Sequence, residues 1–227
     1  MTVLDDTDWS HKAWMSKRDA DLFEHVLLRQ AEARPLLRVL EWGAGKSTRY
    51  FTNLLSQRGV LFHWVSLEYD RVFFEEDVAP HLPLLPAARV SRIERGGLIP
   101  EPQMLLRSRF PAVDFVLFDY GRLRPFLPEG GADRTVSMDD YVGLPATLGV
   151  AFDLVLVDGR KRRRCLLEAA RVISDEGVAV LHDAQRPYYH CAFGAFPAHQ
   201  SLGDILWVGA RYGATLERVL SHAEAVQ

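Results

Sequence analysis

The chain has 227 residues, of which 48% are hydrophobic, and it carries a formal net charge of −3. This length and apolar content predict a folded α/β domain with its own core rather than a disordered chain. The small negative charge argues against a general nucleic-acid surface. No apolar run approaches the roughly 18 residues that span a membrane, so we expect no membrane partner.

The N-terminal residues and the two cysteines show no pattern of a secreted, metal-binding or redox protein. Residues 1–8 are acidic and lack the apolar core of a signal peptide, so a cytoplasmic protein is expected. Cys165 and Cys191 show neither metal-binding nor redox spacing. We therefore expect both cysteines to be buried free thiols.

Helix and strand patterns alternate through the first third of the chain. Residues 19–33 form an amphipathic pattern within an expected N-terminal helical cap, residues 1–35. A strand over 36–41, a helix over 47–56 and a second strand over 61–67 follow. Alternation of this kind predicts a mostly parallel sheet with right-handed crossovers.

The region over 88–135 is expected to be a divergent or inserted segment, because proline and glycine interrupt it repeatedly. Residues 89–93 and 114–118 are both plausible strands, and we expect only one of them to belong to the central sheet. Residues 137–148 have the pattern of a short helix.

The last third of the chain returns to alternating elements. A buried strand is expected over 152–157, a helix over 162–174 and another strand over 178–181. Near the C-terminus, residues 205–210 and 215–220 flank Tyr212-Gly213, which predicts a hairpin.

Polar residues stand where these expected strands end. They are Glu41, Glu68, Asp158, His182 and Asp183. Ligands bind open parallel sheets beyond the carboxyl ends of the strands, so this coincidence indicates a binding or active site at that edge.

The turn after the first strand reads Val39-Leu-Glu-Trp-Gly-Ala-Gly-Lys-Ser-Thr48. A phosphate-binding loop would need a glycine at position 40, where the chain has Leu40. A dinucleotide-binding loop would need a third glycine where Thr48 stands, which weakens that reading. Glycine still allows the backbone to approach a ligand closely.

This segment resembles the first motif of class I S-adenosylmethionine-dependent methyltransferases. The resemblance implies that the loop with Gly43 and Gly45 lies against the methionine part of the cofactor, with Glu41 near its amino group. Glu68 is then expected to take the ribose hydroxyls, since a carboxylate can accept two O–H donors. Ser47, Tyr69 and Asp158 complete the expected cofactor-binding set.

The resemblance continues through residues 152–159 and 177–183, which look like strands four and five of small-molecule O-methyltransferases. The order of motifs is closest to a bacterial group related to the plant glucuronoxylan methyltransferase and xylan-biosynthesis family. It implies one Rossmann-like domain over residues 1–227. It also implies a seven-stranded, mostly parallel sheet with a C-terminal antiparallel hairpin and strand order 3-2-1-4-5-7-6.

Two catalytic arrangements remain open. Asp158 and Asp183 match the acids that hold the metal in catechol-type enzymes, so the pair is a candidate Mg²⁺ site. Ala184 stands where that family has an asparagine. Alternatively, His182 or Asp183 acts as a general base without a metal.

Candidate substrate residues lie beside these acids. The run Arg160-Lys-Arg-Arg-Arg164 would attract an anionic acceptor, or it is a solvated helix start. Arg186 and Tyr188 are expected at the substrate wall, together with Asp139-Asp140-Tyr141. Trp9 and Trp14 are candidates for an aromatic lid.

The sequence therefore predicts methyl transfer to a hydroxyl of a small molecule, with a natural product or a carbohydrate-like compound as acceptor. N-methylation and a catalytically silent partner subunit remain as alternatives, and a homodimer is left open. Transfer of an aminopropyl group is disfavoured, because no acid-rich polyamine pocket adjoins Asp158.

Overall fold

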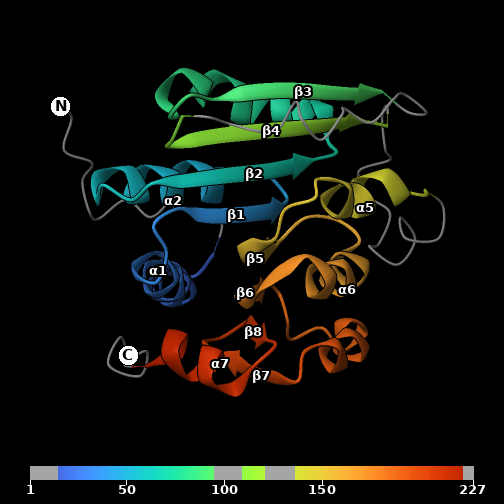
Figure 1. The fold of residues 1–227 in the computed structure, drawn as a ribbon. Helices are drawn as coiled ribbons and strands as arrows, with labels where there is room; N and C mark the ends of the chain where they lie inside the picture. The colour runs from blue at the N-terminus through green and yellow to red at the C-terminus, as the bar shows by residue number, and fades with distance from the viewer. Residues whose placement is uncertain (1–14, 95–108, 121–135, 222–227) are drawn as a thin grey trace.

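The computed structural model describes residues 15–94, 109–120 and 136–221. Within these ranges a single eight-stranded sheet runs through the molecule in the order β3-β4-β2-β1-β5-β6-β8-β7 (Figure 1). Neighbouring strands are parallel from β3 to β6, and β8 is antiparallel to both β6 and β7. The bounds are as follows: α1 Lys17–Glu32, β1 Leu37–Trp42, α2 Lys46–Gln57, β2 Phe62–Glu68, α3 Arg71–Phe73, the π-helical η2 Phe74–Val78, the 3₁₀-helical η3 Ala79–Leu84, β3 Arg89–Glu94, β4 Ala112–Asp119, α5 Asp139–Thr147, β5 Phe152–Val157, α6 Arg162–Val172, β6 Ile173–Leu181, the 3₁₀-helical η5 Pro187–Ala195, β7 Ala198–Leu202, β8 Leu206–Ala210 and α7 Gly213–Leu220.

The central strands are covered on both faces. All six residues of β5 are buried, as its continuous apolar sequence requires in a parallel sheet. One face packs against α5 and α6, for example through Leu144 and Leu166. The other packs against α1, α2 and α7, where Phe23 and Phe51 meet edge to face with ring centroids 4.6 Å apart. This double cover leaves the carboxyl ends of the strands as the open edge.

The expected fold class is confirmed, with one added strand. The order 3-2-1-4-5-7-6 corresponds to β4-β2-β1-β5-β6-β8-β7, and β3 lies outside it at the sheet edge. The expectation that only one of the two middle strands joins the sheet was wrong, because β3 pairs with β4 in parallel. An edge strand needs little burial, and most of β3 is exposed, so its weak apolar pattern did not show that it joins the sheet.

The expected C-terminal hairpin was misplaced. The hairpin joins β7 to β8, whereas the run over 215–220 lies in helix α7. Thr215 and Val219 are both buried, which is the i, i+4 spacing of a helix rather than the alternation of a strand.

Three further expectations concern the two cysteines, Trp9 and Trp14, and a membrane span. Cys165 is buried as expected, but Cys191 is exposed, because it lies in η5 outside the sheet. Trp9 and Trp14 lie outside the described residues. Among the helices of the described ranges, none is long and apolar enough to cross a membrane.

Candidate functional site

The β1–α2 loop makes a close backbone contact with the β5–α6 loop. Gly43 has φ +100°, and its N–H donates to the carbonyl of Leu67 at 2.8 Å. A Cβ atom at Gly43 would lie 2.7 Å from the backbone nitrogen of Gly159 and 2.9 Å from the carbonyl carbon of Asp158. Glycine is therefore required at position 43 for both its backbone conformation and its lack of a side chain.

Glu41 lies beneath this loop, wholly buried. Its carboxylate accepts hydrogen bonds from Ser47 Oγ and Thr48 Oγ1, each at 2.6 Å. It also accepts from Trp64 Nε1 at 2.9 Å and from Ser66 Oγ at 2.8 Å. Burial raises the pKa of Glu41 above its usual value, and these four hydrogen bonds oppose the rise. The carboxylate thus ties the start of α2 to the sheet.

A pocket of about 530 Å³ opens at the carboxyl edge of the sheet. Four segments line it: the β1–α2 loop from Gly43 to Ser47, the end of β2 with Phe73 beyond it, the β5–α6 loop, and the residues after β6. The expected site residues along its wall are Gly43, Gly45, Ser47, Glu68, Tyr69, Asp158, Arg160, His182, Asp183 and Arg186. Glu41 and Tyr188 are not among the lining residues.

Glu68 presents a carboxyl group to this pocket from the end of β2. Its Oε1 accepts the backbone N–H groups of Tyr69 and Asp70, each at 2.8 Å. Burial raises the pKa of Glu68 to about 8, and the backbone hydrogen bonds hold it below what burial alone would give. At neutral pH the group is therefore mostly protonated.

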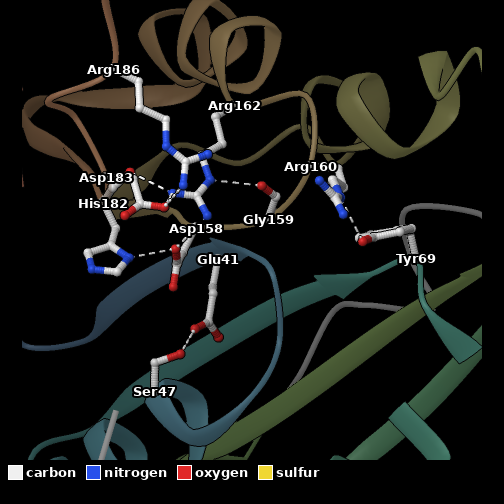
Figure 2. A network of polar contacts seen from close by, with 10 residues as sticks. All are labelled: Glu41, Ser47, Tyr69, Asp158, Gly159, Arg160, Arg162, His182, Asp183 and Arg186. Atoms are coloured by element: carbon white, nitrogen blue, oxygen red, sulfur yellow. Dashed lines mark hydrogen bonds and ion pairs between the residues drawn. The ribbon is translucent and has the colours of Figure 1, made fainter. Parts of the chain in front are cut away.

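Asp158 and His182 form a hydrogen-bonded pair across the ends of β5 and β6 (Figure 2). Asp158 Oδ1 lies 2.8 Å from His182 Nδ1. The other ring nitrogen, Nε2, is buried and has no hydrogen-bond partner among the described residues. Burial alone would lower the pKa of His182, but the hydrogen bond and charge of Asp158 outweigh it and raise that pKa. The arrangement orients the imidazole and leaves Nε2 buried without a hydrogen-bond partner in the described part of the chain.

The expected metal site does not fit these residues. Arg162 stands between the two acids, with Nη2 at 3.1 Å from Asp158 Oδ1 and Nη1 at 2.9 Å from Asp183 Oδ2 (Figure 2). Arg186 also pairs with Asp183 Oδ2, at 3.0 Å. Guanidinium groups thus occupy one oxygen of each carboxylate that would bind Mg²⁺ and place positive charge between the two acids. In the described ranges, no group of three His, Cys, Asp or Glu side chains is placed to hold a metal.

The basic run at the start of α6 is neither a free patch nor a solvated helix end. Arg160 Nε donates to Tyr69 Oη at 2.9 Å, and Lys161 is buried in a left-handed conformation with φ +56°. Arg163 packs over the Tyr188 ring with its guanidinium carbon 4.4 Å from the centroid, and Arg164 pairs with Asp139. Only Arg160 and Arg162 of this run face the pocket.

The sequence patterns did not single out six of the lining residues, namely Ala44, Lys46, Asp70, Phe73, Gly159 and Arg162. Gly159 has the clearest signal, since a glycine directly after a strand-end acid often marks a close approach. Arg162 lies within an unbroken basic run, residues 160–164, which hides its separate role. Its spacing of four residues from Asp158 on a helix start could have separated it.

The strand order and the glycine loop after β1 give this protein the class I methyltransferase fold. A methyltransferase-like protein from Silicibacter pomeroyi has this fold, with a TM-score of 0.58 and 21% identity over 93% of this chain and 96% of that chain. No protein-family model matches this chain, and no curated protein matches it.

More distant solved structures include human methyltransferase-like protein 13 in complex with SAH, with a TM-score of 0.49, 13% identity, and 93% and 92% coverage of the two chains. Another is spermidine synthase from Thermotoga maritima, with a TM-score of 0.45, 11% identity, and 87% and 61% coverage. These likenesses are too loose to bear on the reaction.

Proposed function

We propose that the protein transfers a methyl group from S-adenosylmethionine to a hydroxyl group of a small molecule. The observation that carries the proposal is that the glycine loop, Glu68 and the Asp158–His182 pair line one pocket of about 530 Å³. A cofactor wall and a candidate proton acceptor therefore share one cavity.

The residues of the loop suit this cofactor. The backbone at Gly43 and Gly45 faces the pocket without side chains, which suits a ligand that lies close along the chain. Glu68 provides carboxyl oxygens for the ribose hydroxyls. Glu41, in this proposal, shapes the loop from below rather than binding the amino group itself. The bound cofactor supplies an electrophilic methyl group on a sulfonium.

The remaining chemical task is to accept the proton of the acceptor hydroxyl. His182 is the proposed base, because it lines the pocket and because Asp158, by holding Nδ1, fixes the ring orientation. Asp158 also stabilises the imidazolium that results from proton uptake. The chemistry then depends on positioning and on this proton transfer, with no step through a metal.

The acceptor is proposed to be small and to carry a negative charge. Arg186 lines the pocket with its side chain 48% exposed, and Arg160 lines it from the opposite loop. A guanidinium in such a position can bind a carboxylate or phosphate. The resemblance to the xylan-related bacterial group supports a natural product or a carbohydrate-like acid as the acceptor.

Isothermal titration of the purified protein with S-adenosylmethionine and S-adenosylhomocysteine tests the first half of the proposal. Binding to the native protein and its loss in Gly43→Asp are expected. Absence of binding to the native protein would refute the proposed function. Methyl transfer to a panel of hydroxy acids and matched amines then tests the second half. Transfer to the amines alone would point to N-methylation, and binding without any transfer would favour a silent partner subunit.

A further inference from the structure

Arg162 occupies the centre of a four-acceptor site. Its guanidinium reaches the carboxylates of Asp158 and Asp183 at 3.1 and 2.9 Å. Nη1 also donates to the backbone carbonyl of His182 at 2.7 Å, and Nε donates to that of Gly159 at 2.9 Å. The side chain is only 12% exposed. Two carboxylates and two carbonyls from two separate loops therefore converge on one buried cation.

This acceptor set is also one that a hard divalent cation would use. Mg²⁺ binds carboxylate and carbonyl oxygens at about 2.0–2.1 Å, with water completing the shell. A guanidinium binds the same oxygens through N–H groups at longer distances and stays charged at every physiological pH. We propose that Arg162 is a built-in cation that replaces the divalent metal between Asp158 and Asp183 and excludes it.

The charges around the site agree with this replacement. One guanidinium neutralises only one of the two carboxylates. Arg186 supplies the second positive charge by pairing with the same Asp183 oxygen at 3.0 Å. The pair of arginines thus gives the two acids the compensation that one divalent ion would give, without the need to bind an ion from solution.

The backbone on each side of the contact gives an independent indication that it is held in place. Lys161, directly before Arg162, has φ +56°, and Asp183 has φ +59°. Left-handed backbone at a non-glycine residue persists where the surroundings fix it, and it is concentrated at functional sites. Arg162 joins the two loops that contain these residues, so it acts as a positioning residue for Asp158 and through it for His182.

This positioning role depends on the proposed methyl transfer, but the occupation of the cation site can be tested without a cofactor. Mn²⁺ alone is titrated into the native protein, Arg162→Ala and Arg164→Ala, and bound metal is followed by electron paramagnetic resonance. Arg164 is the matched control, because its loss removes the same charge two residues further along α6, from a pair with Asp139.

Removal of the Arg162 side chain is expected to create one Mn²⁺ site at least about tenfold tighter than in either the native protein or Arg164→Ala. The double variant Arg162→Ala/Asp183→Asn should lose that site. A native protein whose Mn²⁺ binding disappears in Asp183→Asn would overturn the proposal. A folded Arg162→Ala that binds no more tightly than Arg164→Ala would also overturn it.

If Arg162→Ala does not fold, Arg162→Gln and Arg162→Lys replace it. The neutral glutamine should admit Mn²⁺ and the charged lysine should exclude it, and equal binding by the two variants would contradict the proposal. Titration of S-adenosylmethionine into the same proteins is a separate readout. If Arg162→Ala gains no Mn²⁺ site while the native protein binds S-adenosylmethionine, only the built-in cation is rejected. If the native protein does not bind S-adenosylmethionine, the proposed function is rejected.

Discussion

The two sides of the pocket are held by different interactions. The proposed cofactor side, Gly43 to Ser47 with Glu68, contains two glycines, and the carboxylate beneath it, Glu41, is satisfied by neutral hydroxyl and indole donors. The arginine side, Asp158 to Arg162 with His182 to Arg186, is held by ion pairs within each loop and between the two loops.

This difference separates two demands on the site. Close approach of backbone to ligand is a steric requirement, and it needs glycine at a fixed position. Placing a proton acceptor is an electrostatic requirement, and it needs charges balanced around it. A substitution that adds side-chain volume should therefore disrupt the cofactor side. A substitution that removes a charge should disrupt the arginine side.

The largest expected effect on ligand binding is on the cofactor side. Gly43→Ala should weaken S-adenosylmethionine binding by at least about 100-fold, or about 2.7 kcal/mol, because the new Cβ would lie 2.7 Å from the Gly159 nitrogen. Gly59→Ala is the matched control: φ is also positive, at +69°, but nothing lies within 4 Å of the new Cβ. The control should lose about 1–2 kcal/mol of stability and bind normally in calorimetry. Equal loss of binding in both variants would contradict the steric explanation.

On the arginine side, His182→Asn should reduce methyl transfer by about 10²–10⁴-fold while cofactor affinity stays within a factor of about two. Asparagine can still donate to Asp158 but lacks the second ring nitrogen. His199→Asn, in β7 away from the pocket, is the control. Rate measurements at saturating cofactor check the prediction, and an unchanged rate in His182→Asn would remove histidine from the proposed chemistry.

Glu68 should make cofactor binding depend on pH. Its raised pKa of about 8 means that the free protein holds the proton below that pH. Because the carboxylate is the better acceptor for ribose hydroxyls, affinity should rise between pH 6 and 8, by up to about tenfold per unit, and level off above. Calorimetry across this range checks the slope, and Glu68→Gln should abolish it.

The same shift has a consequence for stability. The usual glutamate pKa of 4.5 lies below the folded value of about 8. Between these two pKa values, 4.5 and about 8, the native state therefore holds a proton that the unfolded chain has released. The free energy of unfolding should fall as the pH rises through this range. Denaturant titrations of the native protein and Glu68→Gln compare the two slopes. A native slope no steeper than the variant's would contradict the assignment.

A smaller effect is expected from substitution of Arg186, the exposed cation of the arginine side. Arg186→Gln should raise the KM for an anionic acceptor by about fivefold to tenfold with little change in kcat, because the group is half exposed and solvent screens its charge. Arg163→Gln, which removes a guanidinium packed on Tyr188 outside the pocket, is the control. A neutral acceptor should show no difference between the two variants.

The smallest effect is expected from metal removal. Treatment with EDTA followed by Mg²⁺ add-back should leave methyl transfer unchanged, because Arg162 already holds both carboxylates. Loss of activity that Mg²⁺ restores would show that the arginine side is a metal site after all.

The sequence by itself determined the fold class and the edge of the sheet at which the polar strand ends gather. Apolar runs and turn glycines predict β1, β2, β5 and β6, because these are local properties of the chain. Residues 89–93 had a plausible strand pattern, but the place of β3 in the sheet was not predictable in this way, because it depends on pairing with β4 rather than on an apolar pattern of its own. The helix α7 was missed for a similar reason: a short apolar run fits a strand or a helix until its neighbours select one face.

Only the tertiary structure decided what the polar residues do. The sequence places Glu41, Asp158 and Asp183 at strand ends, but it does not show that Glu41 turns under the loop or that Arg162 bridges the two aspartates. A charged side chain has many possible partners along the chain. The choice among them depends on distances between loops, and those distances exist only once the sheet has brought the strand ends together.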